Sequence, residues 1–221
     1  MSQHTKRFEA PLSWGSIDVK KEKFIITPNP GAQPFLLGLS LAVWLKRVKL
    51  ATTMREIKKI LTTKNVMVNG RRATDPHTST GFLDVLSIPD INLDHRVMLD
   101  ENGVLILTPS RQPRSKPFKI INKTRIKHGK TQLNLIGGTN LLIEKDSYKT
   151  GDTVVLSLPD LKITSHLKLE PGARVAFTGG KHIGDTGTLK TLEKETVTYT
   201  SKTNKELKTI KEHTYVIPNE L

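Results

Sequence analysis

The sequence predicts an α+β fold in which a small helical module is followed by β-rich domains. Three observations lead to this expectation. Helical periodicity is confined to residues 39–61, Asn-Gly pairs at 69–70 and 102–103 indicate tight hairpins, and short alternating strands fill the chain after Pro89. Hydrophobic residues make up 36% and aromatic residues 5% of the 221 residues, which favours several small cores over one large core.

The composition is strongly basic. Lysine and arginine number 35 against 21 aspartates and glutamates, so the formal net charge is +14 and the sequence pI is about 9.9. This excess predicts a polyanionic partner, either nucleic acid or an anionic membrane, with solubility alone as the simpler alternative.

Several classes of protein are excluded by the composition. The chain has no cysteine, which excludes disulfides, cysteine-based zinc sites and thiol nucleophiles, and fits a reducing compartment. No apolar run approaches the roughly 20 residues needed to span a bilayer, and residues 1–24 have no hydrophobic signal-peptide centre. We therefore expect a cytoplasmic or nuclear protein without a membrane partner.

Residues 1–34 predict a basic, extended arm. The segment has no sustained periodicity and ends in a stretch rich in proline and glycine. We expect it to be disordered in the free protein and to become ordered on its partner. Its basic residues are Lys6, Arg7, Lys20, Lys21 and Lys23.

Two short helices are predicted next. Apolar residues at positions 41, 44, 45 and 48 follow the i, i+3, i+4, i+7 spacing, which predicts a helix over residues 39–48 with Ser40 as its N-cap. Thr53 and Glu56 form the Thr-x-x-Glu pattern of a capping box, which begins a second helix. On that helix one face is apolar (Met54, Ile57, Ile60 and Leu61), and Arg55 and Lys59 fall on the opposite side.

The second helix leads into a tight hairpin. Val66 and Val68 alternate, and Asn69-Gly70 favours a type I′ turn because both central residues of that turn need a positive φ. A third strand is expected within residues 81–88. This part of the chain is therefore a helix–helix–sheet module.

The remaining chain predicts a central β domain over residues 93–169 and a small β-barrel over residues 170–221. The central domain contains the second Asn-Gly hairpin and several short strands. The terminal part contains a strand, a glycine-rich turn and two further strands, and it ends in a strand near 213–218. Residues 112–117 and 169–172 are candidate boundaries.

Motifs for catalysis are incomplete. Residues 38–42 nearly match a nucleophile elbow, but Ser40 begins a predicted helix without a strand before it. Residues 179–186 nearly match a P-loop, but Asp185 stands where a lysine would bind phosphate. No two of the 7 histidines have the i, i+4 spacing of a zinc helix, and the carboxylates of Asp84, Asp152 and Asp185 stand at turns. We predict a non-enzyme with no cofactor, no metal and no small-molecule substrate.

Five segments carry a resemblance to known families. Two short helices followed by "VMVNGRR" resemble the S4-type RNA-binding fold, over residues 35–90. The segments "HTKRFEAPLSW", "NKTRIKHGKTQLNL" and "YKTGDTVVLSLPD" resemble the archaeal and eukaryotic small-subunit ribosomal protein S4e family, almost from end to end. The segment "RVAFTGGKHIGDTGTL" resembles a KOW motif, which belongs to a small SH3-like barrel.

The resemblance implies a structural protein of the small ribosomal subunit, from an archaeal source. It implies an N-terminal arm (1–34), an S4-like module (35–92), a central β domain (93–169) and a KOW barrel (170–221). The implied partners are small-subunit (16S-type) rRNA and neighbouring small-subunit proteins, in the cytoplasmic ribosome. The candidate RNA-binding residues are Lys6, Arg7, Lys20, Lys21, Lys46, Arg47, Arg55, Lys58, Lys59, Lys64, Asn69, Arg71, Arg72, Lys181 and His182.

Two alternatives remain at this point. An RNA-modifying enzyme could use an S4-like module to guide a catalytic domain, but it would need a catalytic loop or nucleotide site downstream. A transcription-elongation adaptor would explain the KOW segment alone and would leave the first 100 residues unexplained.

Overall fold

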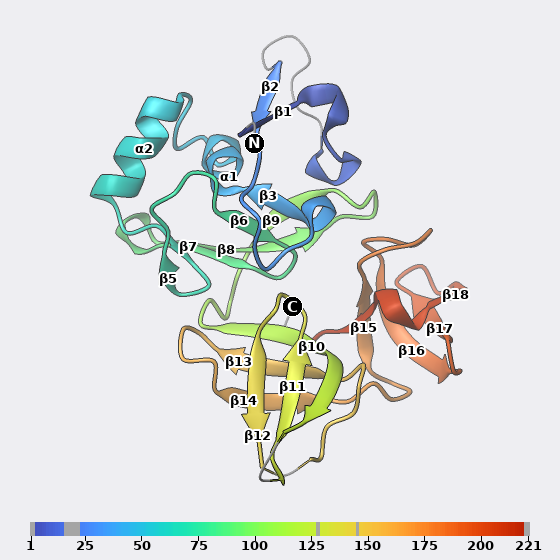
Figure 1. The fold of residues 1–221 in the computed structure, drawn as a ribbon. Helices are drawn as coiled ribbons and strands as arrows, with labels where there is room; N and C mark the ends of the chain where they lie inside the picture. The colour runs from blue at the N-terminus through green and yellow to red at the C-terminus, as the bar shows by residue number, and fades with distance from the viewer. Residues whose placement is uncertain (1–2, 16–22, 127–128, 145, 219–221) are drawn as a thin grey trace. The chain divides into compact units, whose positions relative to one another are not determined.

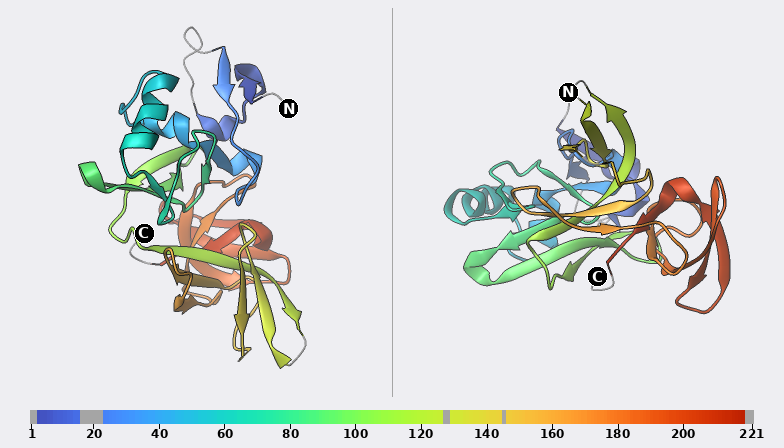
Figure 2. Two further views of the ribbon diagram at one scale, coloured as in Figure 1. Left: turned by 60° about the vertical axis from the view of Figure 1, so that its left-hand side comes forward. Right: turned by 90° about the horizontal axis from the view of Figure 1, so that it is seen from below.

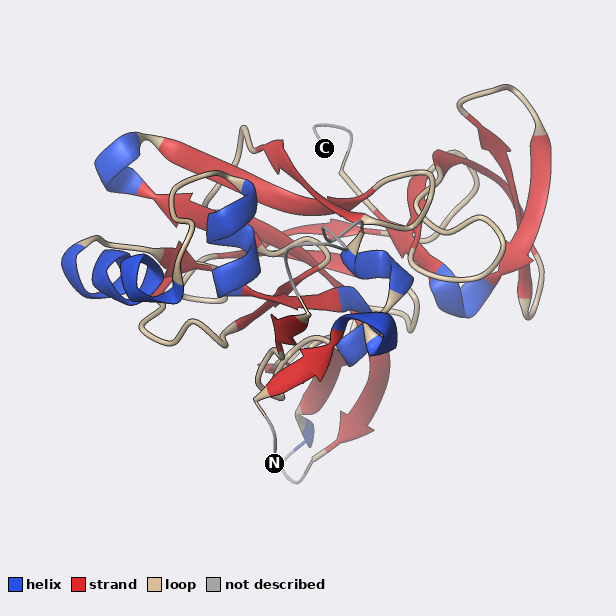
Figure 3. Ribbon diagram, turned by 90° about the horizontal axis from the view of Figure 1, so that it is seen from above, coloured by secondary structure: helices blue, strands red, loops and turns tan. Residues whose placement is uncertain are grey.

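The computed structural model describes residues 3–15, 23–126, 129–144 and 146–218. Strands make up most of the regular secondary structure of the described chain, and both of its α-helices lie in the first third (Figures 1 and 3). Contacts divide the protein into two compact units. Unit 1 comprises Met1–Met98 and Val104–Arg114, and unit 2 comprises Leu99–Gly103 and Ser115–Leu221.

Unit 1 begins with a small antiparallel pair of strands, β1 (His4–Lys6) and β2 (Phe24–Ile26). Between them lie two short 3-10 helices, η1 (Arg7–Glu9) and η2 (Leu12–Trp14). The expectation of a disordered arm is wrong for these described residues, because Trp14 and Ile25 are buried at 0% and 1% exposure. Burying such side chains stabilises by about 1.5–3 kcal/mol each, which offsets part of the entropy lost on ordering the segment.

Two helices follow in unit 1, after η3 (Phe35–Leu37) and β3 (Gly38–Ser40). Helix α1 (Leu41–Arg47) is buried on every side over its first five residues, whereas the spacing predicted a single apolar stripe. Helix α2 (Met54–Thr63) buries only one face, with Ile57 and Leu61 inside. Figure 1 shows both helices on one side of the strands β7 and β8.

The sheets of unit 1 hold these helices. Strand β3 pairs with β6 (Ser79–Gly81), which closes the chain around α1 and α2. A five-stranded sheet has the order β5-β4-β7-β8-β9. Its strands are β4 (Met67–Val68), β5 (Arg71–Arg72), β7 (Val85–Ile88), β8 (Leu93–Leu99) and β9 (Leu105–Pro109).

Strands β8 and β9 therefore continue the sheet of the helical module. The sequence placed a division at residues 92–93, but η4 (Pro89–Ile91) makes a tight turn there and β8 returns to pair with β7. The two units divide instead between Arg114 and Ser115, inside the candidate boundary at 112–117.

The first part of unit 2 is a five-stranded sheet with the order β12-β11-β10-β13-β14. The long strand β10 curves through it (Figure 2) and pairs with β13 in its first half and with β11 in its second half. A bulge between Ile120 and Asn122 separates these halves and allows the bend. The strands are β10 (Ser115–Arg125), β11 (Thr131–Leu135), β12 (Asn140–Ile143), β13 (Thr153–Ser157) and β14 (Ile163–Leu167).

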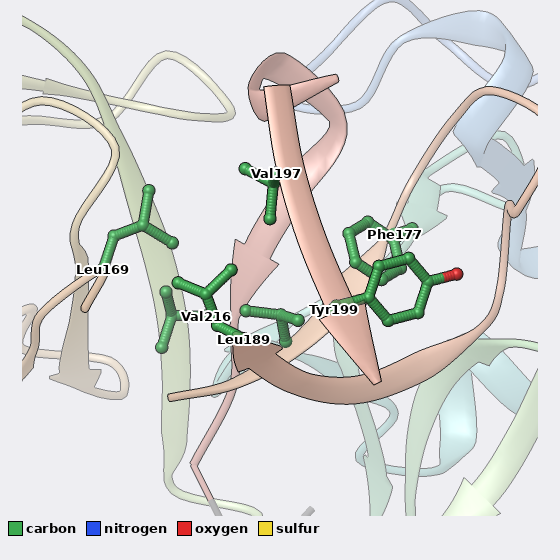
Figure 4. Packing of buried hydrophobic residues seen from close by; sticks show 7 residues of the cluster. Leu169, Phe177, Leu189, Val197, Tyr199 and Val216 are labelled. Carbon is green, nitrogen blue, oxygen red and sulfur yellow. The ribbon is translucent and has the colours of Figure 1, made fainter. Parts of the chain in front are cut away.

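The second part of unit 2 is another five-stranded sheet, with the order β18-β17-β16-β15-β19. The sequence predicted these strands except β18. They are β15 (Arg174–Phe177), β16 (Thr186–Leu192), β17 (Thr196–Ser201), β18 (Glu206–Ile210) and β19 (Thr214–Val216), with η6 (Lys211–His213) before the last. Its core is a small buried cluster drawn in Figure 4: Leu169, Val175, Phe177, Leu189, Val197, Tyr199 and Val216.

Two side chains join the two sheets of unit 2. The hydroxyl of Tyr215 accepts a hydrogen bond from the amide of Lys119 at 2.9 Å and donates one to the carbonyl of Pro117 at 2.7 Å. The ammonium of Lys119 donates to the carbonyls of Lys211 and Glu212 at 3.3 and 2.6 Å. Burial lowers the pKa of Lys119 to about 8, although the nearby Glu212 acts in the opposite direction.

The lowered pKa of Lys119 predicts a pH-dependent stability. The unfolded chain, with an ordinary lysine pKa of 10.5, binds more protons than the folded protein between about pH 8 and 10.5. The free energy of unfolding should therefore rise across this window by about 1–3 kcal/mol more in the wild type than in Lys119→Met. Urea unfolding of both proteins from pH 7.5 to 10.5 measures the difference, and parallel curves would contradict it.

Candidate nucleic-acid interface

Helix α2 begins with the predicted capping box. The amide of Glu56 donates to Oγ1 of Thr53 at 3.3 Å, and Oε2 of Glu56 accepts from the amides of Thr52 and Thr53 at 2.8 and 3.2 Å. The hydrogen bond from the Thr52 backbone is the largest of several that lower the pKa of Glu56. The only acid on this helix is thus held at its N-terminus.

The outward face of α2 carries unpaired positive charge. Arg55, Lys58 and Lys59 are exposed and share one face with Thr62, at the i, i+3, i+4, i+7 spacing. Within the described part of the chain none of the three cations forms an ion pair. Lysines of unit 2 differ, since Lys123, Lys190 and Lys208 each pair with a carboxylate. The face is therefore a net positive surface.

The hairpin after α2 has the geometry that its sequence predicts. Asn69 and Gly70 have φ values of 52° and 74°, as a type I′ turn requires. The Asn69 side chain does not face solvent as a free donor. Its amide nitrogen donates to Oδ1 of Asp84 at 2.7 Å, and its oxygen accepts from the amide of Val85 at 3.0 Å. Asn69 therefore positions the hairpin.

Asp84 completes this clamp from the loop between β6 and β7. Its carboxylate is 2% exposed and also accepts from the amide of Gly81 at 2.7 Å and from Nε2 of Gln33 at 3.2 Å. The turn chemistry predicted for Asp84 is confirmed by the bond from Gly81. The bonds to Asn69 and Gln33 join segments far apart in the sequence, and no local sequence pattern predicts them.

The strand β5 brings two further cations to the end of α2. Arg71 and Arg72 are both exposed, and Nη2 of Arg72 donates to the last-turn carbonyl of Thr62 at 3.2 Å. Figure 1 shows β5 on the side where α2 ends. We call this group the α2–β5 surface; it comprises Arg55, Lys58, Lys59, Arg71 and Arg72.

Other predicted residues near the helices lie elsewhere or have internal partners. Arg47 donates to the carbonyl of Leu105 at 3.1 Å and to that of Trp14, and its guanidinium lies 5.2 Å from the Trp44 ring centroid. Burial lowers the pKa of Arg47, which still leaves it charged. Lys46 lies beside it in the last turn of α1, and Lys64 is half-buried where α2 ends.

The remaining predicted residues are dispersed. Lys6 is exposed and Arg7 half-buried beside the β1–β2 pair, whereas Lys20 and Lys21 lie outside the described residues. In unit 2, Lys181 is exposed and His182 half-buried in the glycine-rich turn after β15.

The near-match motifs lack catalytic geometry. Contrary to expectation, a strand (β3) does precede Ser40, but Ser40 has ordinary extended backbone angles, is fully buried and makes no capping bond. Asp185 accepts from the amide of Thr186 at 2.7 Å and from the hydroxyls of Tyr199 and Ser201 at 2.9 and 3.1 Å. Burial, together with this bond to Asp185, raises the pKa of Tyr199. Asp185 is thus a fixed structural element of the turn.

The part of the chain that the structure describes has neither a metal-binding cluster nor a membrane-spanning helix. There, no three histidine, aspartate or glutamate side chains gather in an arrangement that could hold a metal ion. None of the described helices has the length and apolarity needed to cross a membrane.

Comparisons with known proteins agree on one family. Residues 91–163 match the family model Ribosomal family S4e, and residues 40–79 match the S4 domain. The chain is 37% identical over 232 residues to small ribosomal subunit protein eS4 of Methanocaldococcus jannaschii, across 99% of this chain and 95% of that protein. It is 40% identical over 207 residues to the eS4 protein of Methanosphaera stadtmanae, across 91% and 83%. The crystal structure of the 30S ribosomal protein S4e from Thermoplasma acidophilum is similar with a TM-score of 0.68 and 28% identity, across 82% of this chain and 94% of that one.

The two arginines of the hairpin are expected to differ in their effect on stability. Arg72→Ala removes the donor to Thr62 and a positive charge at the C-terminal end of α2, so it should lower the free energy of unfolding by about 0.5–1 kcal/mol. Arg71→Ala removes an exposed side chain and should change it by less than about 0.5 kcal/mol. Urea unfolding of the two single variants distinguishes them; equal stabilities would mean that the bond to Thr62 contributes nothing.

Proposed function

This chain belongs to the eS4 family of small ribosomal subunit proteins, and we propose on that basis that it is a structural constituent of the small subunit that binds its rRNA. In this role it supports assembly of the subunit and translation in the cytoplasmic ribosome. A structural role also agrees with the expectation of a non-enzyme. The expected archaeal source agrees with the organisms of the similar proteins.

The α2–β5 surface is the part of the protein that we assign to rRNA binding. Its five cations are exposed, and the acid that could have neutralised α2 is held in the capping box. Phosphates along an RNA backbone supply the missing negative charge. A helix face beside a tight hairpin suits a folded RNA junction, which is recognised through phosphates and shape more than through sequence. The single observation that carries the proposal is that none of Arg55, Lys58 and Lys59 forms an ion pair among the described residues.

We also propose an identity for two modules of the chain. The helices α1 and α2 with the hairpin form an S4-like RNA-binding module, a proposal supported by the S4 domain match at residues 40–79. Residues 170–221 form a KOW-type SH3-like barrel, supported by the strand order β18-β17-β16-β15-β19 and the glycine-rich turn at 179–184. Lys181 and His182 of that turn are secondary rRNA contacts. Neighbouring small-subunit proteins contact other parts of the chain.

The roles of three predicted residues are revised. Asn69 and Arg47 have their polar atoms bonded to the protein itself, so we assign both to positioning the module. Arg72 both positions the hairpin and binds RNA, since only one of its nitrogens is bonded to Thr62.

An RNA-modifying enzyme is the weaker alternative. Such an enzyme would need a catalytic domain after the S4-like module, and residues 91–163 instead match Ribosomal family S4e. A transcription adaptor would leave the same segment and the S4 domain without a role.

The salt dependence of rRNA binding tests the proposal. If the surface contacts several phosphates, the logarithm of the binding constant falls with the logarithm of salt concentration by about 0.7–0.9 per contact. The variant Arg55→Ala/Lys58→Ala/Lys59→Ala/Arg71→Ala should bind transcribed 16S-type rRNA more weakly, with a slope shallower by about 3. Filter binding from 50 to 400 mM salt measures both quantities.

A matched control is available in unit 2. Lys190 and Lys208 are exposed but pair with Glu206 and Glu193, so Lys190→Ala/Lys208→Ala should leave affinity and slope close to the wild type. If the fourfold α2–β5 variant and the double lysine variant had the same affinity and the same salt slope, the phosphate contacts would lie elsewhere on the protein.

A further inference from the structure

Two phenylalanine rings, each beside a lysine, lie at the end of the β1–β2 pair: Phe24 begins β2, and Phe8 lies in η1 directly after β1. Nζ of Lys6 lies 5.6 Å from the ring centroid of Phe8, and Nζ of Lys23 lies 5.7 Å from that of Phe24. Lys6 is also directly opposite Phe24 in the strand register, so both side chains stand on the same face. A hydrogen bond of 3.2 Å from the amide of Arg7 to the carbonyl of Lys23 extends the pairing toward Phe8.

Both phenylalanine rings are exposed to solvent. Phe8 is 81% and Phe24 52% exposed, whereas Ile25, the neighbour on the inner face, is 1% exposed. Single exposed apolar side chains are common on protein surfaces, but both of these rings adjoin the same lysine, since Lys6 is opposite Phe24 in the strand register and its ammonium lies over Phe8. Buried residues such as Ile25 therefore hold the β1–β2 pair in place, while the rings of Phe8 and Phe24 remain exposed to solvent.

The position of the lysines decides what this patch can bind. An apolar protein surface that covered the rings would also bury two ammonium groups, and each buried charge without a partner is costly. RNA has no such conflict, since its bases stack on aromatic faces while its phosphates pair with the ammonium groups. The alternation of ring and cation therefore fits unpaired nucleotides.

We propose that Phe8 and Phe24, with Lys6 and Lys23, form a stacking platform for unpaired nucleotides of RNA. The proposal rests on the rRNA-binding function proposed above and adds to it a different kind of contact. The α2–β5 surface contacts backbone charge alone, whereas the two rings of the platform add contacts to base faces. The two surfaces should therefore respond differently to salt and to mutation.

Paired substitutions at the two rings test the platform. Phe8→Leu/Phe24→Leu keeps apolar side chains but removes both π faces, and Phe8→Trp/Phe24→Trp keeps an aromatic face at each position. We expect the leucine variant to bind 16S-type rRNA at least about fivefold more weakly for each stacked base, with an unchanged salt slope. We expect the tryptophan variant to bind within about threefold of the wild type.

Controls separate stacking from other causes. The side chain of Leu12, which is 93% exposed and has no aromatic ring, serves as a matched apolar position, and Leu12→Ala should bind as the wild type does. Equal thermal unfolding of the wild type and the leucine variant shows that the fold is intact. Photo-crosslinking of the wild-type protein to rRNA containing 5-iodouridine, followed by mass spectrometry, should identify peptides that contain Phe8 or Phe24.

The outcomes distinguish this proposal from the function on which it rests. If the leucine variant binds rRNA as the wild type does while the α2–β5 variant loses affinity, the platform is overturned and the rRNA-binding function stands. If the leucine variant binds rRNA normally but fails to join reconstituted small subunits, the patch docks a neighbouring protein and the platform is again overturned. Weaker binding of the leucine variant together with near-normal binding of the tryptophan variant supports the platform.

Discussion

The buried carboxylate of Asp84 organises the proposed rRNA-binding unit. A carboxylate at 2% exposure is tolerated only when hydrogen bonds replace its water, and this one accepts from Gly81, Asn69 and Gln33. These three donors come from the loop before β7, the hairpin tip and the segment before α1. The backbone of Asp84 also accepts from the amide of Val97 in β8. One side chain thus fixes the hairpin relative to the sheet, and with it the direction of Arg71 and Arg72.

The distribution of ion pairs separates structural charge from charge left for a partner. In unit 2, Lys190 of β16 pairs with Glu206 of β18, and Lys208 of β18 pairs with Glu193, which follows β16; such exposed pairs add little stability but cancel the local field. On α2 the only acid is bonded to its own helix N-terminus, so the field of Arg55, Lys58 and Lys59 extends into solvent. The location of uncompensated positive charge is therefore a better guide to function than the total net charge of +14.

Local patterns predicted local structure well, and long-range bonds were beyond them. The Thr-x-x-Glu box, the apolar face of α2 and the Asn69-Gly70 turn each depend on residues within a few positions of one another, and all three are present. The β1–β2 pair was missed because its strands are 20 residues apart in register and only three residues long. For the same reason the sequence does not reveal the bonds that hold Asn69 and Arg47, so both residues resemble RNA ligands in the sequence alone. The exposure of Phe8 and Phe24 likewise depends on the β1–β2 pairing, which no local pattern predicts.

The bridge through Tyr215 has a consequence for the order of folding. Its hydroxyl bonds to the carbonyl of Pro117, 98 residues earlier, and β19 pairs with β15 only after the β16–β17–β18 strands have intervened. Closing such long loops costs conformational entropy before the contact contributes any stabilising free energy. These non-local pairings therefore form late and slowly. The neighbouring hairpins of β16, β17 and β18 are local and form first. Until β19 pairs with it, β15 has one unpaired edge, and such an edge can pair with a strand of another chain and begin aggregation.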